Sequence, residues 1–307
     1  MISKVNVFFI LMMVMGNCLF WKAYMSQTFC ACTECSSSSE DGWFKKRFDK
    51  SVQPLLSANM NFSVDAFDWW KKIQSEQGSF DLFERTVHDL FRMFPPKPDV
   101  KDHRPDYCRT CAVVGNSGNL DKSHYGPLID LQDVVIRMNG AVTKGYEADV
   151  GTRTTHHVMY PESSVHLDES THLVLVPFKI KDIDWLIKAF STGFFGRSYA
   201  PVLSKIKANK NLVMVINPAF MQYVHLKWLE KRGHYPSTGF MALLLAMHIC
   251  DEVHVFGYGA DSDGNWSHYF EKLKDKHLKT GLHPGGVEYG LIQELAKQNK
   301  IRFYKGF

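Results

Sequence analysis

The chain has 307 residues, of which 45% are hydrophobic and 22% are charged, and its formal net charge at pH 7 is +4. This length suffices for one large domain or two modest ones with a substantial buried core. The composition excludes a chain that is disordered over most of its length. The small net charge, without a cluster of lysines and arginines, excludes nucleic acid as an expected partner.

The N-terminus carries an apolar segment. Residues 5–24 begin with VNVFFILMMVMGNCL, which contains no charged residue. The segment has about the ~20 residues that a helix needs to cross a bilayer. We expect a transmembrane signal-anchor at 5–24, behind a cytoplasmic tail of residues 1–4, because no clear cleavage site follows; a cleaved signal peptide is the alternative. The remainder of the chain would then lie on the lumenal side of the membrane.

Six cysteines follow this segment: Cys30, Cys32, Cys35, Cys108, Cys111 and Cys250. They allow many disulfide pairings, among which sequence arithmetic does not choose. The competing interpretation is a zinc site made by the pairs 32/35 and 108/111. Those pairs lie much farther apart than in a zinc ribbon, and an oxidising lumen disfavours free thiolates, so we expect disulfides. Two N-glycosylation sequons, at Asn61 and Asn265, are compatible with this compartment.

The rest of the chain is expected to form a stem and one folded domain. Residues 25–42, MSQTFCACTECSSSSEDG, are polar and serine-rich, which indicates a lumenal stem. Residues 43–94 show helical periodicity, which the proline-rich run 95–98 ends. The folded domain is expected to span 43–307.

From Cys108 onward, short β-branched runs alternate with helical segments. The expected strands are 112–115, 134–138, 155–160, 173–177, 212–216, 252–256 and 301–304. The expected helices between the later strands are 183–191, 218–232, 237–249 and 287–299. This alternation predicts an α/β fold with a mostly parallel sheet flanked by helices. Ligands of such sheets bind at the carboxyl ends of the strands.

A glycine-containing turn stands at one of these strand ends. Residues 111–120 read CAVVGNSGNL, so that an apolar run ends in two glycines separated by Asn and Ser. Such a turn can present backbone N–H groups to a phosphate or a sugar. Asn116 adds an amide, and Asn139, which ends the next strand, can reach the same edge. The spacing matches neither the dinucleotide fingerprint nor the P-loop, and a tight turn without ligand is the alternative.

Acidic residues and histidines near the C-terminus are further candidates. Asp261-Ser-Asp263 resembles the D-x-D with which many sugar-nucleotide enzymes hold a metal, although a solvated turn is the interpretation that we favour. His268 and His283 lie in loop-like sequence of the last strand–helix units. An imidazole can take a proton from a hydroxyl or, when charged, stabilise a departing phosphate. His156 and His157 are adjacent in a strand and point to opposite faces, which opposes a joint site.

Together these segments resemble the motifs of the animal sialyltransferases, glycosyltransferase family 29. The matching segments, in order, are 111–120 with the tract to 152 (large sialyl motif), 217–220 through 234–239 and 256–259 (small motif), 268–271 (third motif), and His283 with Glu288 (very small motif). The likeness runs from about Trp43 to Phe307. Trp69-Trp70, HHVMYPES and CDEVHVFGYGADSDGNW most resemble the β-galactoside α2,3-sialyltransferases that act on Galβ1-3GalNAc.

The resemblance implies a single-domain, Rossmann-like variant of the GT-A glycosyltransferase fold. It implies transfer from CMP-sialic acid, without metal or cofactor, to galactose-terminated glycoproteins or glycolipids, by a type II Golgi membrane protein whose catalytic domain is lumenal. It assigns donor contacts to Asn116, Asn139, Tyr199, Tyr235, Ser237, Gly239 and Gly259, and an acceptor contact to Gln74. The implied disulfides are Cys30–Cys35, Cys32–Cys108 and Cys111–Cys250.

The two histidines would then divide the chemistry between them. His283 would remove the proton from the galactose 3-hydroxyl as this oxygen attacks the anomeric carbon, and direct displacement would invert the configuration. Such base catalysis contributes ~10²–10⁴-fold. His268, assisted by Tyr235, would donate to the departing phosphate. Glu288, one helical turn beyond His283, is a candidate to orient that ring, and an exposed carboxylate is the alternative.

Two positions depart from the family pattern. Ser267 stands where many relatives have a second histidine, and it completes the sequon at Asn265; we expect this sequon to be unoccupied because a glycan would crowd the third motif. Pro284 follows His283 where close relatives often have an acidic residue, which leaves the acceptor preference open. The alternatives are transfer to Galβ1-4GlcNAc or a glycolipid, an inactive glycan-binding homologue, and a nicotinamide-dependent dehydrogenase, which the missing third glycine opposes.

Overall fold

The structure, a computed structural model, describes residue 32 and residues 42–73, 75–101, 103–104, 106–261, 263–271 and 282–306. The expected membrane anchor and most of the expected stem lie outside the described residues. Among the helices of this described part, none combines the length and the apolar character that a bilayer-crossing segment requires.

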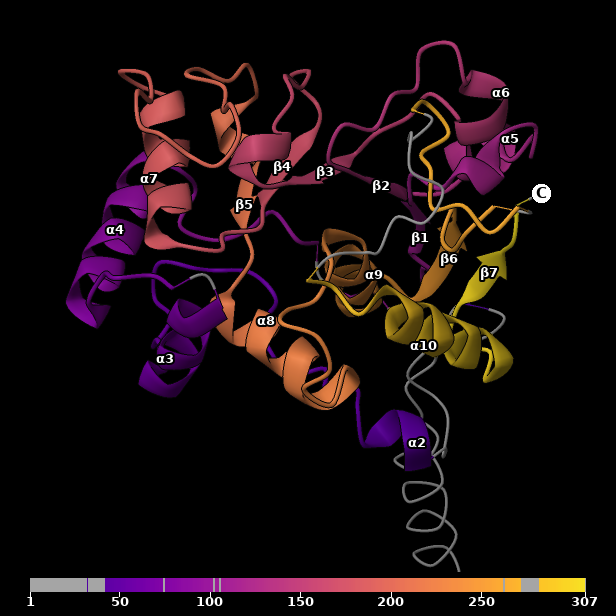
Figure 1. The fold of residues 1–307 in the computed structure, drawn as a ribbon, viewed down its shortest axis with the longest axis horizontal. Coiled ribbons are helices and arrows are strands. Elements are labelled where there is room, and N and C mark those ends of the chain that lie inside the picture. Colours follow the sequence, from indigo (N-terminus) through magenta and orange to yellow (C-terminus); the bar gives the residue numbers. More distant parts are fainter. Residues whose placement is uncertain are drawn as a thin grey trace, which may run out of the picture.

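A seven-stranded sheet organises the fold, and all its neighbouring strands run parallel (Figure 1). The strands are β1 (Thr110–Val114), β2 (Val134–Met138), β3 (His156–Met159), β4 (His172–Leu175), β5 (Val213–Val215), β6 (Glu252–Phe256) and β7 (Arg302–Tyr304). Their order across the sheet is β5-β4-β3-β2-β1-β6-β7. The order reverses at β1, and a crevice for a ligand forms at such a switch point. The predicted α/β class with a parallel sheet is confirmed.

Helices flank the sheet and occupy most of the predicted ranges. They are α2 (Gly42–Lys45), α3 (Val64–Ile73), α4 (Phe80–Met93), α5 (Gly126–Asp130), α6 (Glu147–Val150), α7 (Ile180–Ala189), α8 (Pro218–Tyr223), α9 (Thr238–Ile249) and α10 (Gly285–Lys297). The expected helix 218–232 is not regular, because α8 continues as a π-helix over Val224–Trp228. Glu230 and Lys231 then adopt positive φ values of 51° and 65°, which end the helical path.

Alternate residues of the central strands pack into two separate cores. In β1, Cys111 and Val113 belong to the larger core, whereas Ala112 and Val114 belong to the smaller one. This alternation follows from the two-residue period of a strand. The smaller core includes Ile129 of α5 and Val150 of α6, so these two helices cover one face of the central strands.

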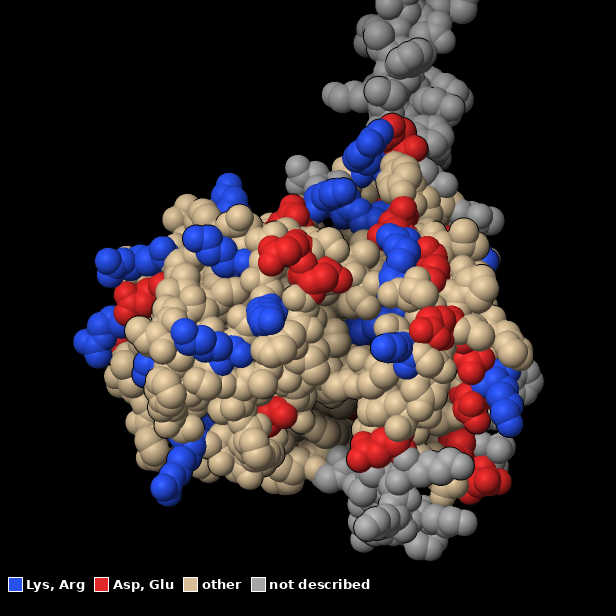
Figure 2. Space-filling view, turned by 90° about the horizontal axis from the view of Figure 1, so that it is seen from above, with Lys and Arg blue, Asp and Glu red and all other residues tan. Residues whose placement is uncertain are grey.

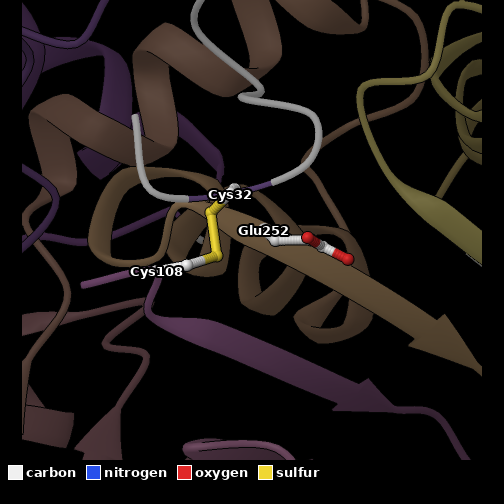
Figure 3. Close-up of side chains that lie close together, drawn as sticks. All are labelled: Cys32, Cys108 and Glu252. Atoms are coloured by element: carbon white, nitrogen blue, oxygen red, sulfur yellow. A yellow bond between two sulfur atoms is a disulfide. The ribbon is translucent and has the colours of Figure 1, made fainter. Parts of the chain in front are cut away.

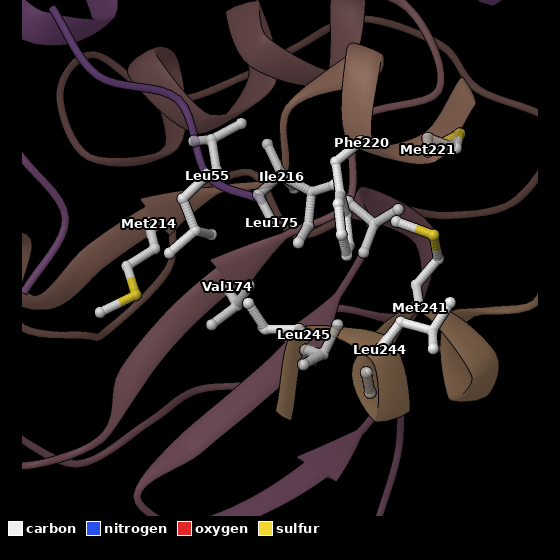
Figure 4. Close-up of a cluster of buried hydrophobic side chains, with 14 of the residues drawn as sticks. Leu55, Val174, Leu175, Met214, Ile216, Phe220, Met221, Met241, Leu244 and Leu245 are labelled. Atoms are coloured by element: carbon white, nitrogen blue, oxygen red, sulfur yellow. The ribbon is translucent and has the colours of Figure 1, made fainter. Parts of the chain in front are cut away.

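Helix α9 lies inside the larger core. Its consecutive residues from Phe240 to Met247 are all buried, as expected of a helix that is apolar on every side. Figure 4 shows Met241, Leu244 and Leu245 of α9 near Val174 and Leu175 of β4. This burial fixes the position of α9. Ser237 caps the start of the helix, because its hydroxyl accepts a hydrogen bond from the Phe240 N–H at 3.0 Å.

Two disulfides tie segments to the amino end of β1. One joins Cys111 in β1 to Cys250 at the end of α9, and the other joins Cys32 to Cys108. Both belong to the pairing that the family resemblance implied. The third implied pair, Cys30 and Cys35, lies outside the described residues.

The same bonds decide against the zinc interpretation. Figure 3 shows Glu252 beside the sulfurs of Cys32 and Cys108, and among the described residues these three make the one group of potential metal ligands. Zinc binds cysteine as the thiolate, and cysteines joined in a disulfide offer none. Because Cys111 is also in a disulfide, the predicted alternative of a four-cysteine site is wrong.

Candidate active site

A cavity of about 270 Å³ lies at the carboxyl ends of β1, β2 and β6. Its wall contains Asn116 after β1, Asn139 after β2, Ser237 and Gly239 at the start of α9, and both His268 and His283. The structure therefore brings the two predicted histidines and, with Gly259, five of the predicted donor contacts to one site. Figure 2 shows the molecule from above, turned by 90° from the view in Figure 1. The visible face is hollowed near its centre, and basic and acidic side chains are interspersed over it.

The glycine turn after β1 packs against the turn after β6. Ser117 donates two hydrogen bonds to this turn, from its N–H to Gly257 O at 3.1 Å and from Oγ to Gly259 O at 2.7 Å. A Cβ on Gly115 would lie 2.2 Å from the Gly257 carbonyl oxygen. Gly118 has more room, since its Cβ would lie 3.4 Å from Ser267 O. Position 115 therefore needs a glycine because the two turns pack closely there, and no ligand has to be invoked to explain it.

We expect Gly115→Ala to lower the free energy of unfolding by about 1–3 kcal/mol, because the added methyl group forces the two turns apart. Gly118→Ala is the matched control, and its effect should stay within about 0.5 kcal/mol because the new contact is ordinary. Urea denaturation followed by circular dichroism measures both values. Equal losses in the two variants would contradict this account of the turn.

Two asparagine side chains line the cavity, and they differ in how fully their amide groups are hydrogen-bonded within the protein. Asn116 donates from Nδ2 to Met138 O at 3.1 Å, while its buried Oδ1 has no hydrogen-bond partner among the described residues. Asn139 has a φ of +55°, and its Oδ1 accepts from the Ser163 hydroxyl at 3.0 Å. Because a buried acceptor without a donor is costly, Asn116 Oδ1 is suited to a ligand donor.

His283 stands just before α10 with a defined tautomer. Its Nδ1 lies 3.3 Å from the Tyr235 carbonyl oxygen. Since a carbonyl can only accept, Nδ1 carries the proton and Nε2 the lone pair. The Tyr235 ring meets the imidazole edge-on, with 4.8 Å between centroids. Burial lowers the pKa of His283, opposed by the hydrogen bond to Tyr235, and the ring is therefore neutral at pH 7.

His268 lies in a segment that is bonded to the glycine turn. Gly118 N donates to Ser267 O at 2.7 Å, and Tyr269 N donates to Asn116 O at 3.0 Å. The His268 side chain is 41% exposed, and its Nδ1 lies 3.4 Å from Glu271 Oε2. A carboxylate at Nδ1 orients the ring with Nδ1–H toward it, so that a protonated His268 has Nε2–H left as a donor.

Glu288 does not orient His283. Its side chain is buried, and its carboxylate accepts two hydrogen bonds from Ser237, from N at 2.8 Å and from Oγ at 2.6 Å. Burial raises the pKa of Glu288, and the Ser237 bonds oppose this. The expectation of an orienting role and the alternative of an exposed carboxylate are both wrong. Glu288 instead fixes the residue that caps α9.

The sequence model of glycosyltransferase family 29, described as sialyltransferase, matches residues 55–300. The chain belongs to the sialyltransferase family. It is 46% identical to CMP-N-acetylneuraminate-beta-galactosamide-alpha-2,3-sialyltransferase 1 of Sus scrofa, over 90% of this chain and 82% of that protein. The Homo sapiens protein of the same name is 45% identical, with 90% and 83% covered.

Solved structures agree with this membership. A crystal structure of a mammalian sialyltransferase superposes with a TM-score of 0.85 at 46% identity, covering 91% of this chain and 99% of that one. A second, described as a mammalian sialyltransferase in complex with Gal-beta-1-3GalNAc-ortho-nitrophenol, has a TM-score of 0.83 at 44% identity, covering 91% and 100%.

The remaining residues that were predicted to contact the donor or the acceptor do not all lie at the cavity. Gly259 lines the cavity with a φ of +95°, and a Cβ there would lie 2.5 Å from the Tyr289 ring. Tyr235 is buried beside His283. Tyr199 is 78% exposed and is absent from the cavity wall; its hydroxyl end lies near Tyr160. Gln74 lies outside the described residues.

The D-x-D sequence forms a turn that bonds to itself. Asp261 Oδ1 accepts from the backbone N–H groups of Asp263 at 3.0 Å and Asn265 at 2.7 Å. These bonds support the interpretation as a solvated turn. The strand histidines are separate as predicted, because His156 stacks on His172 at 4.4 Å while the His157 Nε2 donates to Asn139 O at 2.6 Å.

Proposed function

We propose that this sialyltransferase transfers sialic acid from CMP-sialic acid to the 3-hydroxyl of the terminal galactose in Galβ1-3GalNAc glycans. The reaction inverts the anomeric configuration and needs no metal. One observation carries the proposal: a neutral imidazole of fixed tautomer, His283, shares a cavity with His268 at the switch point of the sheet. The named α2,3-sialyltransferase relatives and the acceptor in the second solved structure support the choice of linkage and acceptor.

The donor would occupy the space between the glycine turn and the start of α9. The N-terminus of a helix carries a partial positive charge that favours a phosphate, and Ser237 and Gly239 line the cavity at this end of α9. The unsatisfied Oδ1 of Asn116 would accept from the donor, and Asn139 would contact it from β2. Tyr199 and Tyr235 complete the proposed donor contacts, and Gln74 would contact the acceptor.

The two histidines would act on opposite sides of the anomeric carbon. Nε2 of His283 would take the proton of the galactose 3-hydroxyl as the new C–O bond forms and the bond to the phosphate breaks. His268, with help from Tyr235, would neutralise the charge that develops on the departing cytidine monophosphate. This leaving group is already a stable anion, so charge stabilisation is the main requirement at that end.

The finer assignments of fold and location are part of the same proposal. We infer a single Rossmann-like domain of the GT-A variant type at 43–307, supported by the parallel sheet with its ligand crevice at β1. We also infer a cytoplasmic tail (1–4), a signal-anchor (5–24) and a stem (25–42) in the Golgi membrane. The two disulfides support a lumenal domain, because such bonds persist in oxidising compartments.

A linkage assay tests the proposal. The detergent-solubilised full chain is incubated with CMP-sialic acid and EDTA on a panel of Galβ1-3GalNAc, Galβ1-4GlcNAc and a galactose-terminated glycolipid. We expect α2,3-linked product on Galβ1-3GalNAc, at a rate that added Mg²⁺ or Mn²⁺ does not change. Failure to transfer, or full dependence on a divalent cation, would contradict the proposal. Preference for Galβ1-4GlcNAc would leave the chemistry standing and correct the acceptor.

A further inference from the structure

A charged cluster with buried carboxylates lies where β3 ends and α7 begins. Its members are Glu162, Lys179 and Asp182. The Lys179 ammonium lies 2.7 Å from Asp182 Oδ1 and 3.6 Å from Glu162 Oε1, and the two carboxylate side chains are only 3% and 4% exposed. Charges removed from water in this way are destabilising unless each keeps its partners, so the cluster holds its members in place.

Glu162 also holds a surface loop. The Ser198 hydroxyl donates a hydrogen bond to Glu162 Oε1, and Ser198 directly precedes Tyr199 in the loop between α7 and β5. On either side, Arg197 O accepts from Lys181 Nζ, and Leu203 O accepts from Trp185 Nε1 at 2.8 Å. Tyr199 itself is 78% exposed. Burial therefore contributes little to fixing its ring, which is held by the contact of its hydroxyl with Tyr160 and by the hydrogen bonds of its neighbours in the loop.

The cluster also borders a row of rings that leads to His283. Tyr160 packs on Phe178 at 6.0 Å, Phe178 on Tyr235 at 5.0 Å, and Tyr235 on His283 at 4.8 Å between centroids. Asp182 Oδ2 accepts from the Phe178 N–H at 2.8 Å, which fixes the middle of this row. A row of packed rings thus links the neighbourhood of the charged cluster to the proposed base.

We propose that Glu162 is a positioning residue for the donor site, which acts by anchoring the Tyr199 loop through Ser198 to the Lys179–Asp182 pair. The inference rests on the proposed function, in which Tyr199 contacts the donor. Glu162 itself touches no substrate in this account. Loss of the anchor leaves the chemical groups in place and lowers the fraction of molecules in which Tyr199 meets the donor.

Ser198→Ala tests the anchor with little risk to the fold, because it removes one hydroxyl from a loop. The expected result is a rise in KM for CMP-sialic acid of about five- to tenfold, as for the loss of a typical hydrogen bond, with kcat and the acceptor KM nearly unchanged. Glu162→Gln should raise the same KM. The matched control is Asp184→Asn, which breaks an exposed ion pair with Lys188 within α7 and should change neither kcat nor either KM.

Limited proteolysis gives a second readout that needs no transfer. Trypsin cleaves after Arg197, next to the anchoring serine, and the appearance of the peptide that ends there is followed by mass spectrometry on the full chain. We expect Ser198→Ala to be cut several-fold faster than the wild type or Asp184→Asn. Unchanged cleavage would overturn the anchor, and faster cleavage with unchanged donor KM would overturn the positioning role.

A fall in kcat without a change in donor KM would also overturn it, by placing the effect on the base. If the wild type shows no transfer, the proposed function has failed. The dissociation constant of CMP, measured by calorimetry, then replaces the donor KM. A Ser198→Ala variant that binds CMP as tightly as the wild type would overturn the inference separately.

Discussion

His283→Ala is expected to lower the rate of sialic acid transfer by about 10²–10⁴-fold while leaving the affinity for CMP largely unchanged. The reason is that Tyr235 O accepts the Nδ1 proton, so Nε2 is the nitrogen of this cavity-lining histidine that can accept a proton. Steady-state kinetics and calorimetry with CMP measure the two quantities. His88→Ala, at an exposed histidine of α4, is the control. Retention of more than about a tenth of the rate would rule out His283 as the base.

The pH dependence of kcat gives an independent check of the same role. Burial lowers the pKa of His283 below the ordinary value of histidine, and the neutral ring is the form that accepts the proton. The rate should therefore stay on its plateau at pH 7 and fall only as the pH drops below the usual histidine range. A fall that begins above pH 7 would show that another group controls the acid limb.

Replacing Cys111 and Cys250 together by alanine is expected to lower the free energy of unfolding by about 2–5 kcal/mol. The bond closes a loop with a sequence separation of 139 between β1 and the end of α9, so its removal increases the freedom of the unfolded chain. Both cysteines are also buried, at 0% and 1% exposure, and lose packing contacts. Guanidinium denaturation of the two proteins measures the difference.

The Cys32–Cys108 bond provides the matched control for that experiment. Its sequence separation is 76, which lowers the loop-closure contribution by roughly 0.5 kcal/mol, and its cysteines are only partly buried. The double alanine variant at Cys32 and Cys108 should therefore lose less stability. A loss equal to or greater than that at Cys111 and Cys250 would contradict this ranking.

Much of the sheet could be predicted because its strands are short apolar runs bounded by polar residues. The structure has β2 at Val134–Met138 and β6 at Glu252–Phe256, the ranges that the sequence pattern predicts. The expected helix 218–232 fails after Tyr223, where the π-helix begins. Neither glycine nor proline marks that change, which depends on the tertiary packing of residues such as Trp228, fully buried in the larger core.

The site could be predicted in part for the same reason. The carboxyl edge of a parallel sheet brings Asn116, Asn139 and the C-terminal loops together whatever their separation in sequence. The role of Glu288 could not be predicted, because its partner Ser237 lies 51 residues away and a glutamate is expected to be exposed. The Ser198–Glu162 contact, across 36 residues, is likewise visible only in three dimensions.

The position of the Cys32–Cys108 bond has a consequence for access by large acceptors. Cys108 precedes the amino end of β1, whereas the cavity begins at Gly115 after its carboxyl end, and a strand of this length separates the two by roughly 20 Å. The cavity therefore lies at the opposite end of β1 from the Cys32–Cys108 bond. If the chain is anchored through the residues ahead of Cys32, as proposed above, a bulky glycoprotein acceptor would not have to pass between the enzyme and the membrane.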